Sequence, residues 1–495
     1  MSPTRAATRP NVLVVMVDQH RADCLGCYGN GEVRTPNIDA IGTEGVRYEN
    51  SFCPFPVCTP SRYCFLSGRY AFEHQGLNNR SSPLPDIVMW PGLLRRAGYH
   101  TAAVGKMHFT PTYLDVGFSR MCLSEQDGPG RWDDDYHRYL RDHGLVDAND
   151  LIDQRKEYRE HANEAYWRDL GAMPSNLDEE HHSTTWIGDR AMEELGTWEA
   201  DANLLMVSFI KPHHPHDPPR TWWEQYRAEA VTPLPGWMTA CPERDLMFNR
   251  GYFPHDRFDE AALRRVTAAY YANIAHVDQQ VGRILAELRR RGHYDNTLIL
   301  YTSDHGEYMG FHHMTLKGGI MYDPLVRVPL LIKYPNGGPS GAVSSKLVSN
   351  VDIAPTVLGA AGVAVHSDMK GKDLREDTDG HEFVFAEDGR SWHVMARDQR
   401  HKLIRQAPGT PPLLFDLKSD PVELHNMYGR PEYRDVAERL EAALDGWRGS
   451  FERPGAYVNH GAPVIDQPNV PVRNDGHREQ MIVYCKTAME RHGVV

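Results

Sequence analysis

The sequence contains no apolar run of the roughly 20 residues that a bilayer-spanning helix needs, and its first ten residues lack the apolar core of a signal peptide. Only 8 of its 495 residues are cysteine, and their spacing forms no disulfide framework, so we expect reduced thiols. These absences predict a cytoplasmic protein with no membrane partner.

An excess of positive charge is also absent. The formal net charge of -13 argues against nucleic-acid binding through the phosphate backbone, because that interaction needs a cationic face. Any anionic substrate must therefore meet a local positive pocket. With 41% hydrophobic residues the chain can bury a sizeable core, which excludes a disordered protein.

Two hydrophobic segments far apart in the sequence read as strands of a parallel sheet. Residues 11–17 are β-branched and apolar on both faces, as in a buried central strand, and residues 297–301 follow a long amphipathic helix over 263–288. Further strands are expected at 101–104, 204–209 and 329–333, with helices between them. The pattern predicts an α/β fold with a large, mostly parallel or mixed sheet flanked by helices.

The chain divides into two predicted parts. Residues 1–375 would form the catalytic domain, with a polar insertion at about 122–180 lying over the site. Residues 376–495 would form a smaller C-terminal subdomain, in which short strands suggest an antiparallel sheet followed by a helix around 436–447. The apolar tail at 481–484 suggests a surface for a possible homo-oligomer.

The strands predicted at 11–17 and 297–301 are each followed by groups that can bind a cation. Asp18 follows the first, and Asp304 and His305 follow the second. In open α/β sheets ligands bind at the carboxyl ends of the strands. Carboxylate oxygens suit Ca²⁺, Mg²⁺ or Mn²⁺, and an imidazole ligand favours Mn²⁺ among them. The sequence therefore predicts one divalent metal ion at this edge.

The run Cys58-Thr59-Pro60-Ser61-Arg62, closed by Leu66-Ser67-Gly68-Arg69, resembles the signature of the type I sulfatases of the alkaline phosphatase superfamily. Similar segments extend over nearly the entire chain, at 11–18, 105–108, 303–306, 317–329 and 415–426. In that family a formylglycine-generating enzyme, here an expected partner, oxidises the Cys. The resemblance implies that Cys58 becomes formylglycine, whose hydrate has two hydroxyls on one carbon.

Two departures from the commonest family pattern indicate a subgroup. Asp18-Gln19 stands where many sulfatases have Asp-Asp, and Asp304-His305 stands where they have Asp-Asn. These pairs resemble the subgroup that contains choline sulfatases and phosphonate monoester hydrolases. The resemblance implies Asp18, Gln19, Cys58, Asp304 and His305 as metal ligands, and the neutral amide and imidazole leave the identity of the metal open.

A cationic pocket is assigned by the same resemblance. Lys106 and Lys317 match the lysines that hold sulfate oxygens, Arg62 would orient the aldehyde hydrate, and His108 matches the His that contacts it. Lys106 and His108 lie two apart on a segment expected to be extended, so both can face the same side. His108 is the candidate base for the second half of the reaction.

Two assignments stay open between neighbouring residues. By its position after the strand at 204–209, His213 best matches the family's proton donor to the leaving oxygen, and His216 is the competing choice. Asn79 resembles a residue that contacts the transferred group, although its neighbour Asn78 fits almost as well. The aromatic residues of the insertion could surround a leaving group or simply pack; they are Trp132, Tyr136, Tyr166 and Trp167.

The implied reaction is hydrolysis of a sulfate monoester to an alcohol and inorganic sulfate. Cations bind the nonbridging oxygens while an acid protonates the departing oxygen. The substrate would be a sulfated small molecule or carbohydrate: a sulfated sugar, an aryl sulfate and a small alkyl sulfate such as choline sulfate all remain open. The alternatives are a phosphonate or phosphate ester hydrolase on the same scaffold and a catalytically silent binding protein. Against the first, phosphonate monoester hydrolases carry uncharged residues in the segment of Lys106 and His108.

Overall fold

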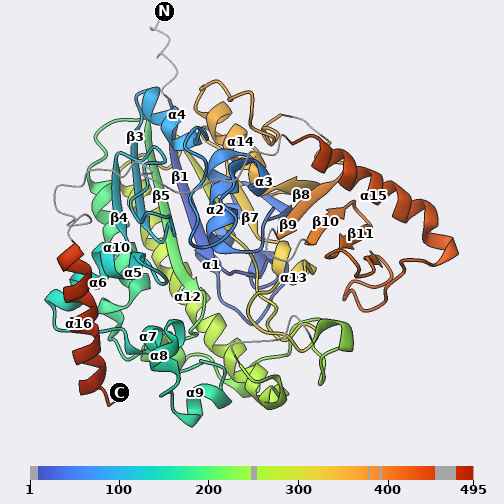
Figure 1. Ribbon diagram of the computed structural model, residues 1–495. Helices are drawn as coiled ribbons and strands as arrows, with labels where there is room; N and C mark the ends of the chain where they lie inside the picture. Colours follow the sequence, from blue (N-terminus) through green and yellow to red (C-terminus); the bar gives the residue numbers. More distant parts are fainter. Residues whose placement is uncertain (1–8, 247–252, 377–378, 389–392, 452–474, 494–495) are drawn as a thin grey trace, which may run out of the picture.

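The strand β1 (Asn11–Asp18) is buried along its whole length and lies in the middle of a large sheet (Figure 1). The computed structural model describes residues 9–246, 253–376, 379–388, 393–451 and 475–493. The order in this eight-stranded sheet is β4 (Arg120–Leu123), β3 (His100–Gly105), β5 (Asn203–Pro212), β1, β6 (Thr297–Ser303), β7 (Leu330–Lys333), β2 (Val46–Phe52) and β8 (Ala342–Ser349).

The sheet is parallel except around β7. β1 pairs in parallel with β5 and β6, and β3 pairs in parallel with β4 and β5, whereas β7 runs antiparallel to both of its neighbours. The mixed sheet and the flanking helices confirm the predicted fold class. All five predicted strands of the sheet are present, and β2, β4 and β8 come in addition.

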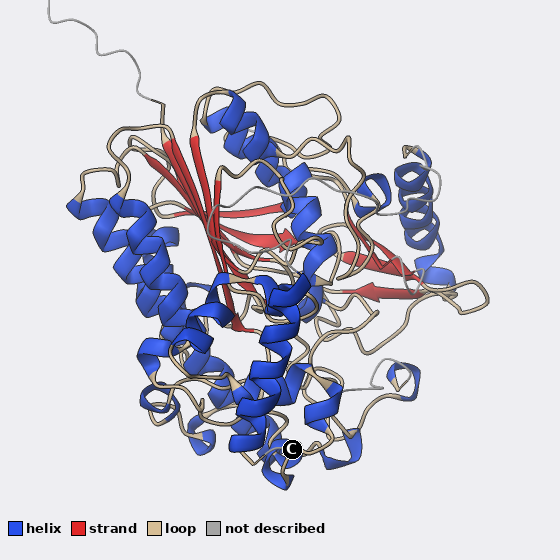
Figure 2. Ribbon diagram, turned by 60° about the vertical axis from the view of Figure 1, so that its left-hand side comes forward, coloured by secondary structure: helices blue, strands red, loops and turns tan. Residues whose placement is uncertain are grey.

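Successive side chains of a strand point to opposite faces, so each face of the sheet builds its own core. Val12, Val14 and Met16 pack on one face, whereas Leu13 and Val15 pack on the other. The first layer of helices contains α2 (Cys58–Ser67), α4 (Trp90–Arg96) and α14 (Ile353–Ala360), and the second contains α1 (Pro36–Thr43), α10 (Ser183–Gly196) and α12 (Glu260–Arg290). The result is three layers, with the sheet between two sets of helices (Figure 2).

A second, antiparallel sheet lies beside the first. Its order is β12 (Leu413–Asp416), β11 (His401–Arg405), β10 (His393–Arg397) and β9 (Val384–Asp388), and α15 (Arg434–Gly449) packs against it. Ile404 and Phe415 of this sheet share an apolar cluster with Phe52 of β2, so the two sheets are joined through buried side chains. The predicted C-terminal sheet and helix are thus confirmed, and the boundary at 375 stays a prediction.

Short helices follow β4 in the predicted insertion. They are α5 (Gly130–Asp133), α6 (Asp135–Asp142), α7 (Ala148–Gln154), α8 (Lys156–Arg159) and α9 (Glu164–Arg168). The remaining helices are α3 (Ala71–His74), α11 (Arg220–Trp223), α13 (Asp323–Val326) and α16 (Asp475–Arg491). The extent 122–180 of the insertion stays a prediction, although its first residues belong to β4.

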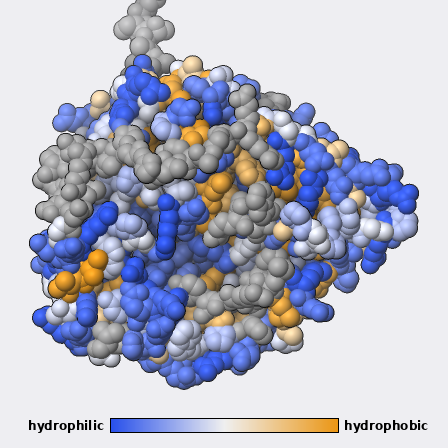
Figure 3. All heavy atoms as spheres, viewed as in Figure 1, coloured by the Kyte–Doolittle hydropathy of each residue, from blue (hydrophilic) through white to orange (hydrophobic). Residues whose placement is uncertain are grey.

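The C-terminal helix α16 packs on this insertion. Met481 is buried among residues that include Trp132, and the Tyr484 hydroxyl donates to the backbone oxygen of Leu145 at 2.8 Å. The neighbouring Ile482 and Val483 are exposed, in the region of α16 where Figure 3 shows a small apolar patch. Part of the predicted oligomer surface is therefore occupied within the chain, and homo-oligomer formation stays a prediction.

None of the helices in the described part of the chain is both long and apolar enough to cross a bilayer. The eight cysteines are all free, as expected from their spacing. The cytoplasmic location stays a prediction.

Candidate active site

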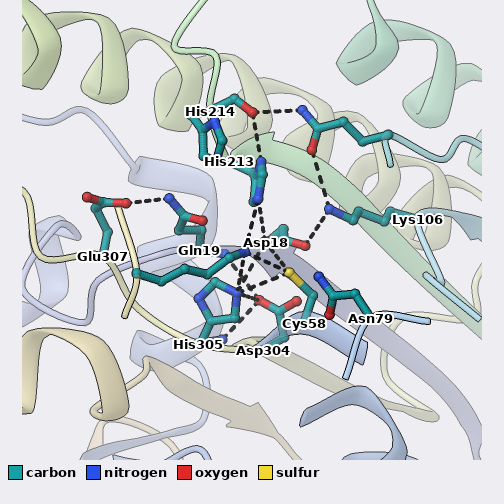
Figure 4. Close-up of polar contacts among 12 residues, drawn as sticks. Asp18, Gln19, Cys58, Asn79, Lys106, His213, His214, Asp304, His305 and Glu307 are labelled. Carbon is teal, nitrogen blue, oxygen red and sulfur yellow. Dashed lines mark hydrogen bonds and ion pairs between the residues drawn. The ribbon is translucent and has the colours of Figure 1, made fainter. Parts of the chain in front are cut away.

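Four neighbouring strands each deliver a side chain to the same place (Figure 4). Lys106 follows β3, His213 follows β5, Asp18 ends β1, and Asp304 and His305 follow β6. These strands are adjacent in the order β3-β5-β1-β6 and run parallel, so their carboxyl ends meet at one edge. Gly105 enables the turn to Lys106, because a Cβ there would lie 2.1 Å from the backbone oxygen of Ser208 and its φ is 93°.

Cys58 is placed at the same edge by the start of α2. The preceding Val57 is extended, with φ -142° and ψ 140°, and α2 begins at Cys58. Pro60 is tolerated in the first turn, where a backbone N–H would have no helical partner, and Gly68 ends the helix with φ 64°. The partial positive charge of a helix N-terminus favours an anionic group at position 58.

Cys58, Asp18, Asp304 and His305 form a buried cluster whose ligand atoms all lie within 4.8 Å of one another. Gln19 adds an amide oxygen that is buried and has no hydrogen-bond partner, while its amide nitrogen donates to Glu307. The amide is brought here by a left-handed backbone at Gln19, whose φ is 66°. Two carboxylates, an imidazole and an unsatisfied amide oxygen are a donor set that fits a divalent cation.

The Cys58 thiol stands where the proposed aldehyde hydrate would be, and cationic and imidazole groups surround it. Its Sγ lies 2.9 Å from Lys317 Nζ, 3.2 Å from His305 Nε2 and 3.6 Å from Asp18 Oδ1. Burial raises the pKa of Cys58, but Lys317, Lys106 and His305 lower it more strongly, so the pKa lies well below its usual value. The site thus stabilises negative charge at this position.

Buried cations and carboxylates form ion pairs next to Cys58. Lys106 Nζ is 2.8 Å from Asp18 Oδ2, and Arg62 contacts both Asp18 and Asp304, at 3.2 and 2.9 Å. Burial raises the pKa of Asp18, but Lys106 and other cations more than offset this, and the pKa falls far below its usual value. Burial and the charge of Asp18 raise the pKa of Asp304.

His213 faces the same cluster from the end of β5. Its Nε2 is 3.0 Å from Lys317 Nζ, and its Nδ1 is 2.7 Å from the backbone oxygen of His214. Since a carbonyl oxygen can only accept, the proton of the neutral ring lies on Nδ1 and Nε2 is presented to the site. Burial and the nearby Lys317 and Lys106 lower the pKa of His213 well below its usual value.

A family model described as sulfatase matches residues 10–363, which is more than half of the chain. The chain belongs to the sulfatase family. A second family model, described as N-sulphoglucosamine sulphohydrolase, C-terminal, matches residues 310–449 of this sulfatase. The predicted family and the predicted enzyme class, a sulfuric ester hydrolase, are confirmed.

Two relatives support this placement, and one solved structure shares the fold. The sulfatase is 31% identical over 474 residues to an arylsulfatase of Clostridium perfringens, which covers 88% of this chain and 94% of that one. It is 29% identical over 484 residues to an N-acetylglucosamine-6-O-sulfatase of Bacteroides thetaiotaomicron, with coverage of 88% and 86%. A phosphonate monoester hydrolase of Silicibacter pomeroyi shares the fold, with a TM-score of 0.75, 22% identity and coverage of 90% and 96%.

The remaining predicted site residues lie at the rim of the cluster. His108 lies close enough to Cys58 to contribute to the lowered pKa of its thiol, and the Nδ1 of His108 is buried without a hydrogen-bond partner. Its φ of 54° is left-handed, so the segment turns at His108 rather than continuing as the extended backbone expected from the sequence. Asn79 Oδ1 accepts from the backbone N–H of Thr59 at 3.2 Å, beside the start of α2.

His216 lies in another environment. Its ring meets Tyr270 edge-on, with 5.5 Å between the ring centroids, and burial lowers its pKa to about 3. No contact from His216 to Cys58 is found among the described residues, whereas His213 reaches the cluster through Lys317. This geometry favours His213 of the two candidates.

The aromatic residues of the insertion pack into apolar clusters. Trp132 packs near α16, Tyr136 joins the core beneath the sheet, and Tyr166 and Trp167 pack beside Leu263 of α12. The structure therefore supports a packing role for these aromatic residues rather than contact with a leaving group.

Three residues that hold the site together were not predicted from the sequence. Glu307 accepts a hydrogen bond from the side-chain amide of Gln19, and Gln126 accepts one from Lys106. The backbone carbonyl of His214 accepts the hydrogen bond from His213 Nδ1. His214 had a weak signal in its position next to His213. Gln126 had none, because it lies in an insertion of no recognised motif.

Proposed function

We propose that this enzyme hydrolyses a sulfate monoester by means of a formylglycine derived from Cys58 and one divalent metal ion. The observation that carries the proposal is the meeting of Cys58 with Asp18, Asp304 and His305 in one buried cluster. Lys317 lies within hydrogen-bond distance of Cys58 and His305, so these atoms already accommodate a positive charge.

The metal would be held by Asp18, Gln19, Asp304 and His305, together with the modified residue 58. When bound, it would supply positive charge that polarises the nonbridging oxygens of the substrate. Three side chains offer oxygen and one offers imidazole nitrogen. We therefore propose Ca²⁺ or Mn²⁺, with Mg²⁺ as the remaining candidate.

Lys106 and Lys317 would bind the nonbridging oxygens from two sides. Both ammonium groups face the cluster, and Lys106 is almost fully buried, so its charge is weakly screened by solvent. Arg62 is turned toward the two carboxylates, and we propose that it fixes their positions rather than contacting substrate.

His213, when protonated at Nε2, would donate this proton to the departing oxygen and return to the neutral ring. Negative charge on the bound substrate would raise the pKa of His213 from the low value set by burial and the two lysines. Its Nδ1–H is held by the backbone oxygen of His214, so Nε2 is the nitrogen that reaches the site. His108 lies against Cys58 and would serve as base for the modified side chain, whose second hydroxyl allows sulfate to be expelled. Asn79, beside the first turn of α2, would contact the transferred group.

A sulfated small molecule or carbohydrate is the proposed substrate class. One relative is named for activity on N-acetylglucosamine 6-O-sulfate and another for aryl sulfates, and both match most of this chain. A panel of sulfated sugars, aryl sulfates and choline sulfate, assayed for released sulfate, would rank these candidates.

The nature of residue 58 provides the first test. Trypsin should release the peptide 48–62, which contains both Cys53 and Cys58. In protein from the native host we expect an aldehyde at residue 58 and a thiol at Cys53, the internal control on the same peptide. Mass spectrometry with fragmentation assigns each position, and a thiol at both would support the silent binding protein.

Substrate preference tests the alternative hydrolase function, which the phosphonate monoester hydrolase fold suggests. We expect the modified enzyme to cleave an aryl sulfate with a higher kcat/KM than the matching aryl phosphonate monoester. The reason is the buried Lys106 and the adjacent His108, which replace uncharged residues expected in phosphonate hydrolases. A reversed order of kcat/KM would favour the phosphonate activity.

A further inference from the structure

A buried amide joins two sides of the active site. Gln126 lies just beyond β4 and is 1% exposed. Its Oε1 accepts from Lys106 Nζ at 3.4 Å, and its Nε2 donates to the backbone oxygen of His214 at 2.7 Å and to Asp150 Oδ1 at 2.6 Å. Lys106 and His214, the two ends of this bridge, are labelled in Figure 4.

The chemistry of the neighbours fixes the orientation of this amide. An ammonium can only donate, so it must face the oxygen of Gln126, and the carbonyl of His214 and the carboxylate of Asp150 must face its nitrogen. A flipped amide would lose all three interactions. Gln126 therefore has one orientation compatible with both sides of the site.

The carbonyl that Gln126 holds also controls the ring of His213. It is the acceptor of His213 Nδ1 at 2.7 Å, and the rings of His213 and His214 stack with centroids 4.2 Å apart. His214 Nδ1 is in turn 2.5 Å from Asp153 Oδ2 of the insertion. The direction of His213 Nε2 thus depends on the His214 peptide group, whose oxygen also accepts from Gln154 Nε2 at 3.2 Å.

Glu125, the residue before Gln126, holds the Lys106 side of the bridge. Glu125 Oε1 accepts from the backbone N–H groups of Met107 and His108 at 3.0 and 2.9 Å. Glu125 and Gln126 together contact the segment of Lys106 through its backbone and through its ammonium group. The insertion consequently fixes this segment relative to the loop after β5.

We propose that Gln126 is a positioning residue that keeps Lys106 and His213 at the mutual distance required by one bound substrate. The inference rests on the proposed function, in which Lys106 binds a nonbridging oxygen and His213 serves the departing oxygen. Those two oxygens are attached to the same sulfur, so their protein partners must be aligned together. Gln126 contacts Lys106 directly, and it contacts the His214 carbonyl that holds the ring of His213.

The test is Gln126→Met, which keeps the approximate length of the side chain and removes its hydrogen bonds. We expect kcat/KM to fall about 10- to 100-fold for phenyl sulfate, the effect typical of residues that orient an active group. The loss should be clearly smaller for a nitrophenyl sulfate, whose good leaving group needs little help from His213. A purely structural defect would instead reduce activity toward all aryl sulfates by one common factor.

Three further variants make the result decisive. Gln280→Met removes a buried amide whose bonds go to Gln279 and Arg283 on α12, and its leaving-group dependence should match the wild type. In His213→Ala, kcat/KM should depend steeply on the leaving group of the aryl sulfate. The double variant with Gln126→Met should show the same leaving-group dependence as His213→Ala alone. If Gln126→Met does not fold, Gln126→Leu is measured instead, since it removes the same three hydrogen bonds without placing a charge against Asp150.

Equal losses for all leaving groups, or no loss in Gln126→Met, would overturn the positioning role. A wild-type enzyme that carries formylglycine yet cleaves none of the aryl sulfates would instead overturn the proposed function. If the wild type and His213→Ala show the same dependence of kcat/KM on the leaving group, His213 is not the acid, and sulfate hydrolysis itself is not contradicted. The outcomes for the inference and for the proposed function are therefore distinct.

Discussion

Replacing Cys58 with Ser is expected to abolish turnover. A Ser at this position is still surrounded by Lys317, His305 and Asp18, yet it has one hydroxyl, so it lacks the second group that would expel sulfate. We expect kcat to fall on the order of 10⁶-fold, as when other catalytic nucleophiles are removed. Rapid-quench assays should show at most one alcohol released per protein molecule.

The matched control is Cys122→Ser, which changes a half-buried cysteine of β4 that lies outside the cluster. It should retain wild-type kcat and a wild-type circular dichroism spectrum. Sustained turnover by Cys58→Ser at a rate near that of the wild type would refute the central role given to residue 58.

Loss of one carboxylate is expected to have the second largest effect. Asp304→Ala removes a proposed metal ligand and one of the two carboxylate partners of Arg62. Because a bound metal contributes several kcal/mol to such reactions, kcat/KM should fall ~10³-fold. In the wild type treated with chelator, adding Ca²⁺ or Mn²⁺ should raise Tm, since ligands that bind the folded state stabilise it.

In Asp304→Ala that rise in Tm should be absent, and elemental analysis should find less bound metal. Asp278→Asn is the control, because Asp278 is a buried carboxylate of α12 that bonds Asn37 and the backbone of Ile38. It should retain the metal-dependent rise even if its overall Tm is lower. An unchanged metal content in Asp304→Ala would contradict the assignment of this ligand.

The sheet and half of the site could be predicted because both follow from local patterns. A buried strand reads as a continuous apolar run, and the residue after such a run in a parallel sheet must lie at the carboxyl edge. Asp18, Asp304 and His305 follow from this rule. Cys58, Lys106 and Lys317 needed the family resemblance, because their segments show no periodicity that places them.

The residues that were missed act through contacts between segments distant in sequence. Gln126 and His214 are 88 positions apart, and their contact depends on how the insertion folds back over the sheet. Likewise, the left-handed backbone of His108 could not be predicted, because positive φ is uncommon in residues other than glycine even though His adopts it more often than most. Such features are decided by tertiary packing, which single-segment patterns do not encode.

The complete burial of α2 limits when residue 58 could be modified relative to folding. All ten residues from Cys58 to Ser67 are enclosed by the fold. An oxidising enzyme that must grasp this segment would find it only before the helix settles onto the sheet. Activation would then be decided during or soon after synthesis, and a molecule that folded first would stay inactive until it unfolded again.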